Sequence, residues 1–205
     1  MYSINSKFGT KEDLVALSAA LHEHDMLLMV DVAPNHMGAA GPLLDINYET
    51  YRPFNARRHY HPPNFIKDYA NQTEVEQFWM GSPSAPLPDL NTELPEVYNE
   101  LYEWINQLVK NYSIDGLRLD TAKHIRKSFW PQFCRSAGVF TMGEAAYEIP
   151  EIEFFFLLNM SADSSKLAAY QQFIPGLLDF ISYKQINQSL TAPHKMKQLY
   201  STTVN

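Results

Sequence analysis

Three short apolar segments of this chain are separated by segments with helical periodicity, and the second and third of them end in a charged residue. They are MLLMVDVAP from Met26, IDGLRLD from Ile114 and VFTMGE from Val139. Short runs rich in Val, Leu and Ile are typical of buried parallel strands. Strands that alternate with helices predict an α/β fold. In (β/α) barrels the active site forms where the strands end, so the terminal charges indicate function at that edge.

Apolar residues at helical spacing mark the segments around these strands. Residues 11–24 predict a helix whose inner face carries Leu14, Leu17 and Leu21, with Ser18 between them. Residues 95–111 predict a second helix that begins at Pro95, where the missing N–H costs little. Its buried stripe is expected to comprise Val97, Leu101, Trp104, Ile105 and Leu108.

The later part of the chain continues the alternation. Residues 125–136 predict a short helix in which Pro131 lies near a turn or kink. A further strand is expected over 176–183 and a last helix over 193–205. Together these elements predict an incomplete (β/α)8 TIM barrel, about strands 3 to 6.

Residues 37–94 change character, because Pro, Asn, His and aromatic residues replace any long helical period. The stretch is too long for an ordinary connection, so it predicts a small subdomain inserted after barrel strand 3. The barrel would then comprise 1–36 and 95–205. Residues 151–167 fit neither a strand nor a helix, and we interpret them as an anomalous insertion.

Composition excludes several classes of protein. The chain has 205 residues, 45% of them hydrophobic, which is ample for a packed core. Its formal net charge of −7 would repel nucleic acid and suits a neutral substrate such as a sugar. No apolar run approaches the roughly 20 residues of a membrane span. The N-terminal segment MYSINSKFGTKEDL predicts no signal peptide, which leaves an intracellular location open, and a single cysteine, Cys134, excludes an internal disulfide.

The segment IDGLRLD carries the first candidate catalytic carboxylate. A strand places Arg118 and Asp120 on one face and Leu117 and Leu119 on the other. Arg118 should lower the pKa of Asp120 and keep it ionised, as a nucleophile requires. A purely structural ion pair at a strand end would produce the same pattern.

Glu144 repeats the arrangement one βα unit later. Gly143 before it permits close backbone approach. Apolar surroundings would raise the pKa of Glu144, as a general acid requires, although a helix-capping glutamate would also fit. Two carboxylates about 5 Å apart are what a retaining glycosidase needs, and neighbouring barrel strands allow that separation.

Further polar residues follow the same strands. After the first strand, Asn35 offers an oxygen ligand and His36 can bind a substrate hydroxyl, although an ordinary turn would also explain both. Asp31 is interpreted as a structural anchor. Lys123 and His124 add donors near Asp120, and a lysine there could alternatively act as a Schiff-base nucleophile.

Glu76 and Asp89 lie in the predicted subdomain. Hard oxygen ligands from distant segments suit Ca²⁺, but nothing in their spacing shows a metal, and on spacing alone solvent-exposed acids are favoured. The sequence contains no zinc-ligand spacing, Walker loop or G-x-G-x-x-G motif.

Four segments together, in this order, resemble the conserved regions of fungal α-amylases of glycoside hydrolase family 13. LMVDVAPNHMG resembles the first region, GLRLDTAKH the second and GEAAY a shortened third, while LPDLN resembles the extra region of the inserted subdomain. The resemblance extends over about residues 1–150. It implies a TIM-barrel enzyme, expected as a monomer, that cleaves internal α-1,4 bonds of starch or glycogen.

The resemblance also implies a role for each matching residue. Asp120 would be the nucleophile, Glu144 the acid/base, and Arg118 the residue that holds Asp120 ionised. Substrate would bind His36, Tyr69, Arg118, Lys123 and His124. A structural Ca²⁺ would bind Asn35, Glu76, Asp89 and the backbone carbonyl of His124.

Three departures from the family pattern accompany this resemblance. The fourth conserved region, with a further catalytic Asp, has no counterpart, so the isolated chain is expected to have little or no activity. Asn64 and Phe78 stand where secreted relatives carry a disulfide. Residues 151–167 have no family counterpart, and we interpret them as a translated intron or a loop insertion. Relatives of this kind are secreted, so secretion is expected for the full-length parent.

Three other functions remain open at this stage. A glucan transglycosylase would use the same carboxylates but exclude water. A truncated gene product would be non-catalytic, since an open barrel exposes strand edges. A Schiff-base lyase would use Lys123.

Overall fold

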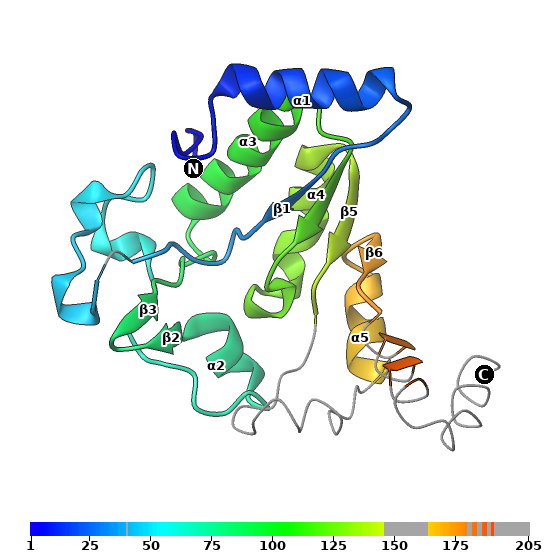
Figure 1. Ribbon diagram of the computed structural model, residues 1–205. Coiled ribbons are helices and arrows are strands. Elements are labelled where there is room, and N and C mark those ends of the chain that lie inside the picture. Colours follow the sequence, from blue (N-terminus) through cyan, green and yellow to red (C-terminus); the bar gives the residue numbers. More distant parts are fainter. Residues whose placement is uncertain (40, 146–163, 180–181, 184–185, 188–189, 191–205) are drawn as a thin grey trace.

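A parallel four-stranded sheet forms the centre of the molecule (Figure 1). In the computed structural model, which describes residues 1–39, 41–145, 164–179, 182–183, 186–187 and 190, the strands lie in chain order. They are β1 (Met29–Val32), β4 (Gly116–Leu119), β5 (Phe140–Gly143) and β6 (Gly176–Leu177). Neighbouring parallel strands joined through helices have barrel connectivity. The predicted α/β fold and partial barrel are confirmed.

Four helices accompany the sheet, and their ends have local causes. They are α1 (Lys11–Glu23), α3 (Pro95–Tyr112), α4 (Trp130–Ala137) and α5 (Ser164–Gln171). Thr10 and Asp13 form a capping box at the start of α1. Pro95 opens α3 as expected, and Gly138 ends α4 in the left-handed conformation, with φ of 69°. None of the helices in the described ranges is long and apolar enough to cross a membrane.

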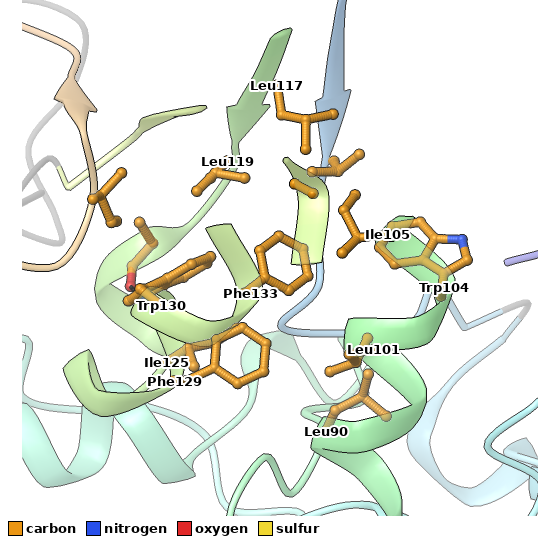
Figure 2. Close-up of a cluster of buried hydrophobic side chains, with 14 of the residues drawn as sticks. Leu90, Leu101, Trp104, Ile105, Leu117, Leu119, Ile125, Phe129, Trp130 and Phe133 are labelled. Carbon is orange, nitrogen blue, oxygen red and sulfur yellow. Dashed lines mark hydrogen bonds between the residues drawn. The ribbon is translucent and has the colours of Figure 1, made fainter. Parts of the chain in front are cut away.

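The main hydrophobic core lies between the sheet and helices α3 and α4 (Figure 2). Leu117 and Leu119 of β4 are fully buried, and they face the same cluster as Ile105 of α3 and Phe133 of α4. Arg118, between the two leucines, is directed to the opposite face. The expected division of β4 into an apolar face and a charged face is therefore confirmed.

Residues 37–94 contain short elements of their own, apart from residue 40. They are η1 (Leu43–Asp45), η2 (Tyr48–Thr50), η3 (Arg57–His59), α2 (Gln72–Gln77), β2 (Met80–Ser82) and β3 (Ala85–Leu87). Strands β2 and β3 pair antiparallel, and α2 packs against η4 (Ala122–His124), which follows β4; η5 (Lys127–Phe129) leads into α4. On this basis we propose that 37–94 form a subdomain inserted into a partial barrel of 1–36 and 95–205.

The buried surfaces of the first elements differ from expectation. Strand β1 was expected to be buried, but Met29 and Asp31 are exposed and only Val32 is buried, because β4 is its one neighbour among the described strands. In α1, Leu17 is half exposed and Ser18 is buried, because the inner face follows positions 14, 18 and 21.

The later elements also differ in part. Leu108 of α3 is half buried, while Val109 is buried. Among the described residues of the strand expected over 176–183, only Gly176–Leu177 form a strand, and residues 182–183 are helical. The helix expected over 193–205 and the insertion over 151–167, up to residue 163, lie outside the described residues.

Candidate active site

One guanidinium group binds three carboxylates at the carboxyl end of the sheet. Arg118 Nη1 donates to Asp120 Oδ1 at 2.9 Å and to both oxygens of Asp31, at 2.8 and 2.7 Å. Its Nη2 donates to Glu144 Oε2 at 2.7 Å. The two candidate catalytic carboxylates are therefore held by the same side chain, from neighbouring strand ends.

The backbone explains why these side chains meet. Asp120 N donates to Val32 O at 2.9 Å, and Glu144 N donates to Leu119 O at 2.8 Å, so the hydrogen-bond ladder extends one residue beyond each strand. Both carboxylates consequently leave the same edge of the sheet, as the barrel prediction requires.

Asp31 joins the cluster because β1 and β4 are in register. The two strands place Asp31 directly beside Arg118. The sequence alone predicts only a structural anchor at Asp31 and gives no link to Arg118. The alternation in MVDV, which sets Asp31 on the same sheet face as Arg118 once the register is known, was the available signal.

The environment raises the pKa of Glu144 above that of an ordinary glutamate. Burial contributes most, and a hydrogen bond with Asp120 together with its negative charge adds to the rise, while Arg118 opposes it. The protonated form of Glu144 is therefore favoured more than that of an ordinary glutamate. This is the direction predicted for a general acid, although the cause includes Asp120 as well as burial.

Thr121, directly after Asp120, has a strained backbone that no motif in the sequence indicates. Its φ of 52° is in the left-handed region, which is rare for a β-branched residue. In this conformation its N–H faces the Glu144 carboxyl group, and its hydroxyl donates to Asn35 Oδ1 at 3.3 Å. Such strain is often concentrated at functional sites.

The candidate sugar-binding residues form a second group beside the carboxylates. Lys123 Nζ lies 5.3 Å from the centre of the Tyr69 ring, and the Tyr69 and His124 rings meet edge to face at 6.2 Å. Lys123 and His124 are both buried. Burial lowers the pKa of His124 to about 3, helped by the charge of Lys123, so His124 is neutral.

His36 interacts electrostatically with Asp120 and with His124. Burial lowers its pKa, and the nearby charge of Asp120 partly opposes that effect. Its Nδ1 lies 3.4 Å from the carbonyl oxygen of Met37.

Three of the four candidate metal ligands converge. Asn35 Nδ2 donates to Asp89 Oδ1 at 2.6 Å and reaches the backbone oxygen of His124 at 3.5 Å. Asp89 is 1% exposed, so the alternative of a solvent-exposed acid is wrong for this residue. Glu76 is linked indirectly, because Gln72 Nε2 donates to Glu76 Oε1 at 2.7 Å and to the backbone oxygen of Lys123 at 3.0 Å.

These ligands do not form a cluster of charged residues. In the described part of the chain, no group of three or more His, Cys, Asp or Glu side chains could hold a metal ion. The candidate set instead mixes two carboxylates with an amide oxygen and a backbone carbonyl. Oxygen donors of this kind suit Ca²⁺ rather than a transition metal.

Comparison with known proteins points to one family. The model of the α-amylase catalytic domain matches residues 1–172. α-Amylase 1 of Lipomyces kononenkoae is 39% identical over 183 residues, which are 89% of this chain and 27% of that protein. α-Amylase mde5 of Schizosaccharomyces pombe is 47% identical over 144 residues, which are 70% of this chain and 28% of that protein.

A solved structure agrees with these relatives. The α-amylase from Malbranchea cinnamomea superimposes with a TM-score of 0.81 and 37% identity, over 98% of this chain and 41% of that one. The chain thus spans between about a quarter and two fifths of the length of the proteins it matches.

Proposed function

This chain belongs to the α-amylase family of glycoside hydrolases, family 13, and from that membership we propose that its parent protein hydrolyses internal α-1,4-glucosidic bonds of starch or glycogen with retention of configuration. The observation that supports this most is the guanidinium of Arg118, which binds Asp120 and Glu144 together while the pKa of Glu144 is raised. A general acid needs a raised pKa, and a retaining enzyme needs a second carboxylate close to that acid.

In the first step, the Asp120 carboxylate attacks the anomeric carbon while Glu144 transfers its proton to the glycosidic oxygen. The glycosidic bond breaks, and a glycosyl ester to Asp120 forms. In the second step, water attacks the anomeric carbon, Glu144 accepts the water's proton, and the ester bond to Asp120 breaks. Both residues return to their starting protonation states.

Residues around the carboxylates would bind the glucan. The Tyr69 ring offers a stacking face, and His36 and neutral His124 offer imidazole nitrogens to sugar hydroxyls. His124 Nδ1 lies 3.0 Å from the carbonyl of Val75 and donates to it, so its Nε2 is an acceptor. Lys123 would donate from the ammonium group.

The oxygen ligands described above fit a structural Ca²⁺. Asn35 lies within hydrogen-bond reach of both Asp89 and the His124 carbonyl, and Gln72 links Glu76 to the neighbouring Lys123 carbonyl. A bound Ca²⁺ would supply charge that links the subdomain to the segment after β4. Asn35 would have to present its amide oxygen to the ion rather than its nitrogen.

We further propose that the parent is a secreted monomer and that the 205-residue chain alone has little or no activity. Fungal relatives at 39% and 47% identity support the first point only by analogy. The second rests on the absence from this sequence of a counterpart to the family's fourth conserved region.

Activity on maltoheptaose tests the proposal. The protein produced from the complete reading frame should release products that are first detected as α-anomers by ¹H NMR. Asp120→Asn and Glu144→Gln should each abolish this, whereas Asp45→Asn, an exposed carboxylate in η1, should not. The 205-residue chain is assayed beside it.

Each other result has a defined meaning. β-Anomers would exclude retention, and products longer than the substrate would indicate a transglycosylase. An inactive complete protein would indicate a non-catalytic gene product. Glu144-dependent cleavage by the 205-residue chain would contradict the proposal that it is inactive. Inactivation by borohydride with a carbonyl substrate would indicate a Schiff base on Lys123.

A further inference from the structure

His61 is bonded through every polar atom that it has. Its backbone N donates to Asp89 O at 3.0 Å, and its backbone O accepts from Trp79 Nε1 at 3.1 Å and Arg57 Nη1 at 3.2 Å. Its side-chain Nδ1 lies 2.5 Å from Asp89 Oδ2, and Nε2 lies 2.8 Å from Glu93 Oε2. The residue is buried. These contacts therefore hold the imidazole ring in one orientation.

The imidazole ring bridges two carboxylates, one in the interior and one near the surface. When the ring carries a proton on both nitrogens, it donates to Asp89 through Nδ1 and to Glu93 through Nε2. The Asp89 side lies in the interior, and the Glu93 side is near the surface, with the Glu93 side chain 37% exposed. The imidazole thus connects a buried carboxylate to an outer one.

Glu93 in turn is tied to another segment. Arg126 Nε lies 3.7 Å from Glu93 Oε1, and the same guanidinium donates to Thr92 O at 3.3 and 2.7 Å. Arg126 follows η4, whose His124 carbonyl is a candidate metal ligand. The series Asp89, His61, Glu93, Arg126 therefore joins both sides of the proposed metal site.

We propose that His61 is a positioning residue that fixes the Asp89 carboxylate in the orientation that binds a divalent cation. The inference rests on the proposed Ca²⁺ site. Asp89 Oδ2 accepts from His61, so the carboxylate cannot rotate without losing this bond, which remains when Asn35 turns its amide oxygen toward the ion. Each oxygen keeps a further lone pair for the ion. Partners of this kind commonly change metal affinity about 10- to 100-fold when they are removed.

Two substitutions separate the two bonds of the ring. In His61→Asn the amide nitrogen occupies the position of Nδ1 and can still donate to Asp89. In His61→Gln it occupies the position of Nε2 and can still donate to Glu93. Both replacements are neutral and polar, so they remove the positive charge equally. A difference between them shows which of the two bonds, that to Asp89 or that to Glu93, matters more for the affinity.

Calcium affinity is measured by titrating CaCl₂ into the chelator-stripped 205-residue chain, using isothermal calorimetry. His61→Asn is expected to bind Ca²⁺ close to the wild-type affinity, and His61→Gln about 10-fold or more weakly. His24→Gln, the same replacement at an exposed histidine after α1, is the control and should bind as wild type. Melting in EDTA, followed by circular dichroism, checks that each variant is folded.

Several outcomes would overturn the proposal. Equal loss in both variants would show that charge or general packing matters instead of the bond to Asp89. Unchanged affinity in His61→Gln, even with a lower melting temperature, would leave His61 a structural brace only. Wild-type chain that binds no Ca²⁺ would remove the proposed calcium site itself, and with it the positioning role.

Discussion

Replacing Arg118 by methionine is expected to destabilise the chain by about 3 kcal/mol near neutral pH, using the usual worth of charged hydrogen bonds. The bonds to Asp120 and Glu144 involve side chains that are 27% and 24% exposed. At about 1.5–3 kcal/mol each, these two bonds would together contribute roughly 3–6 kcal/mol. Solvent screening reduces their contribution to about 3 kcal/mol. The bonds to Asp31 add little, because its side chain is 59% exposed.

The stability lost in Arg118→Met should depend on pH. The pKa of Glu144 is raised in the folded chain, so its contribution to stability is present at low pH and lost as pH rises through that pKa. Arg118 opposes the rise. Without Arg118 the pKa of Glu144 rises further, and the carboxylates repel one another once ionised. The destabilisation of Arg118→Met should therefore be larger at about pH 8 than at about pH 4.

Urea unfolding followed by tryptophan fluorescence measures both effects. A change of about 3 kcal/mol corresponds to a lower melting temperature by roughly 6–12 °C for a chain of this size. Arg118→Lys keeps the positive charge but not the forked geometry of the guanidinium, and it should lose less stability than Arg118→Met. Arg135→Met, at an exposed arginine bonded only to Gln132 in the described hydrogen bonds, should change stability by less than about 0.5 kcal/mol. Equal stability of Arg118→Met and Arg135→Met, or a loss independent of pH, would refute the reasoning.

Three further predictions concern packing and protonation. Gly143→Ala should cost about 1–3 kcal/mol, because the new Cβ would meet a neighbouring side chain at 2.8 Å, whereas Gly38→Ala meets nothing within 4 Å and should be neutral; thermal melts of both compare them. Leu101→Ala should cost about 2–5 kcal/mol in urea unfolding, and Leu44→Ala, 95% exposed, almost nothing; similar losses would contradict the described core. In the complete protein, the alkaline limb of kcat should lie above the pKa of an ordinary glutamate, and a limb at or below that pKa would contradict the assignment of Glu144 as the acid.

Local periodicity was sufficient for much of the fold. The helix over Pro95–Tyr112 follows from its apolar spacing and its proline, and the two faces of β4 follow from alternation. The same alternation placed Arg118 and Asp120 on one face without knowledge of any neighbour. Where periodicity was weak, the expectation failed: the strand predicted over 176–183 is only two residues long.

The burial of a residue was harder to predict from the sequence than the type of element it lies in, because burial depends on neighbours that the local sequence does not specify. MLLMVDVAP has the composition of a buried strand, yet β1 pairs with β4 alone among the described strands, so Met29 is 45% exposed. Conversely, Asp89 looked like a surface acid and is fully enclosed, because Asn35 and His61 both bond it.

The sequence by itself determined which chemistry lies at the strand ends: a basic side chain beside Asp120, a second carboxylate one unit later, and oxygen donors around them. Only the tertiary structure decided how they share partners. Asp31 and Arg118 are 87 residues apart and meet through strand register, and His61 and Asp89 are 28 apart and meet through the packing of the inserted segment. The physical reason is that alternation acts between adjacent residues, whereas register and packing are set by the chain as a whole.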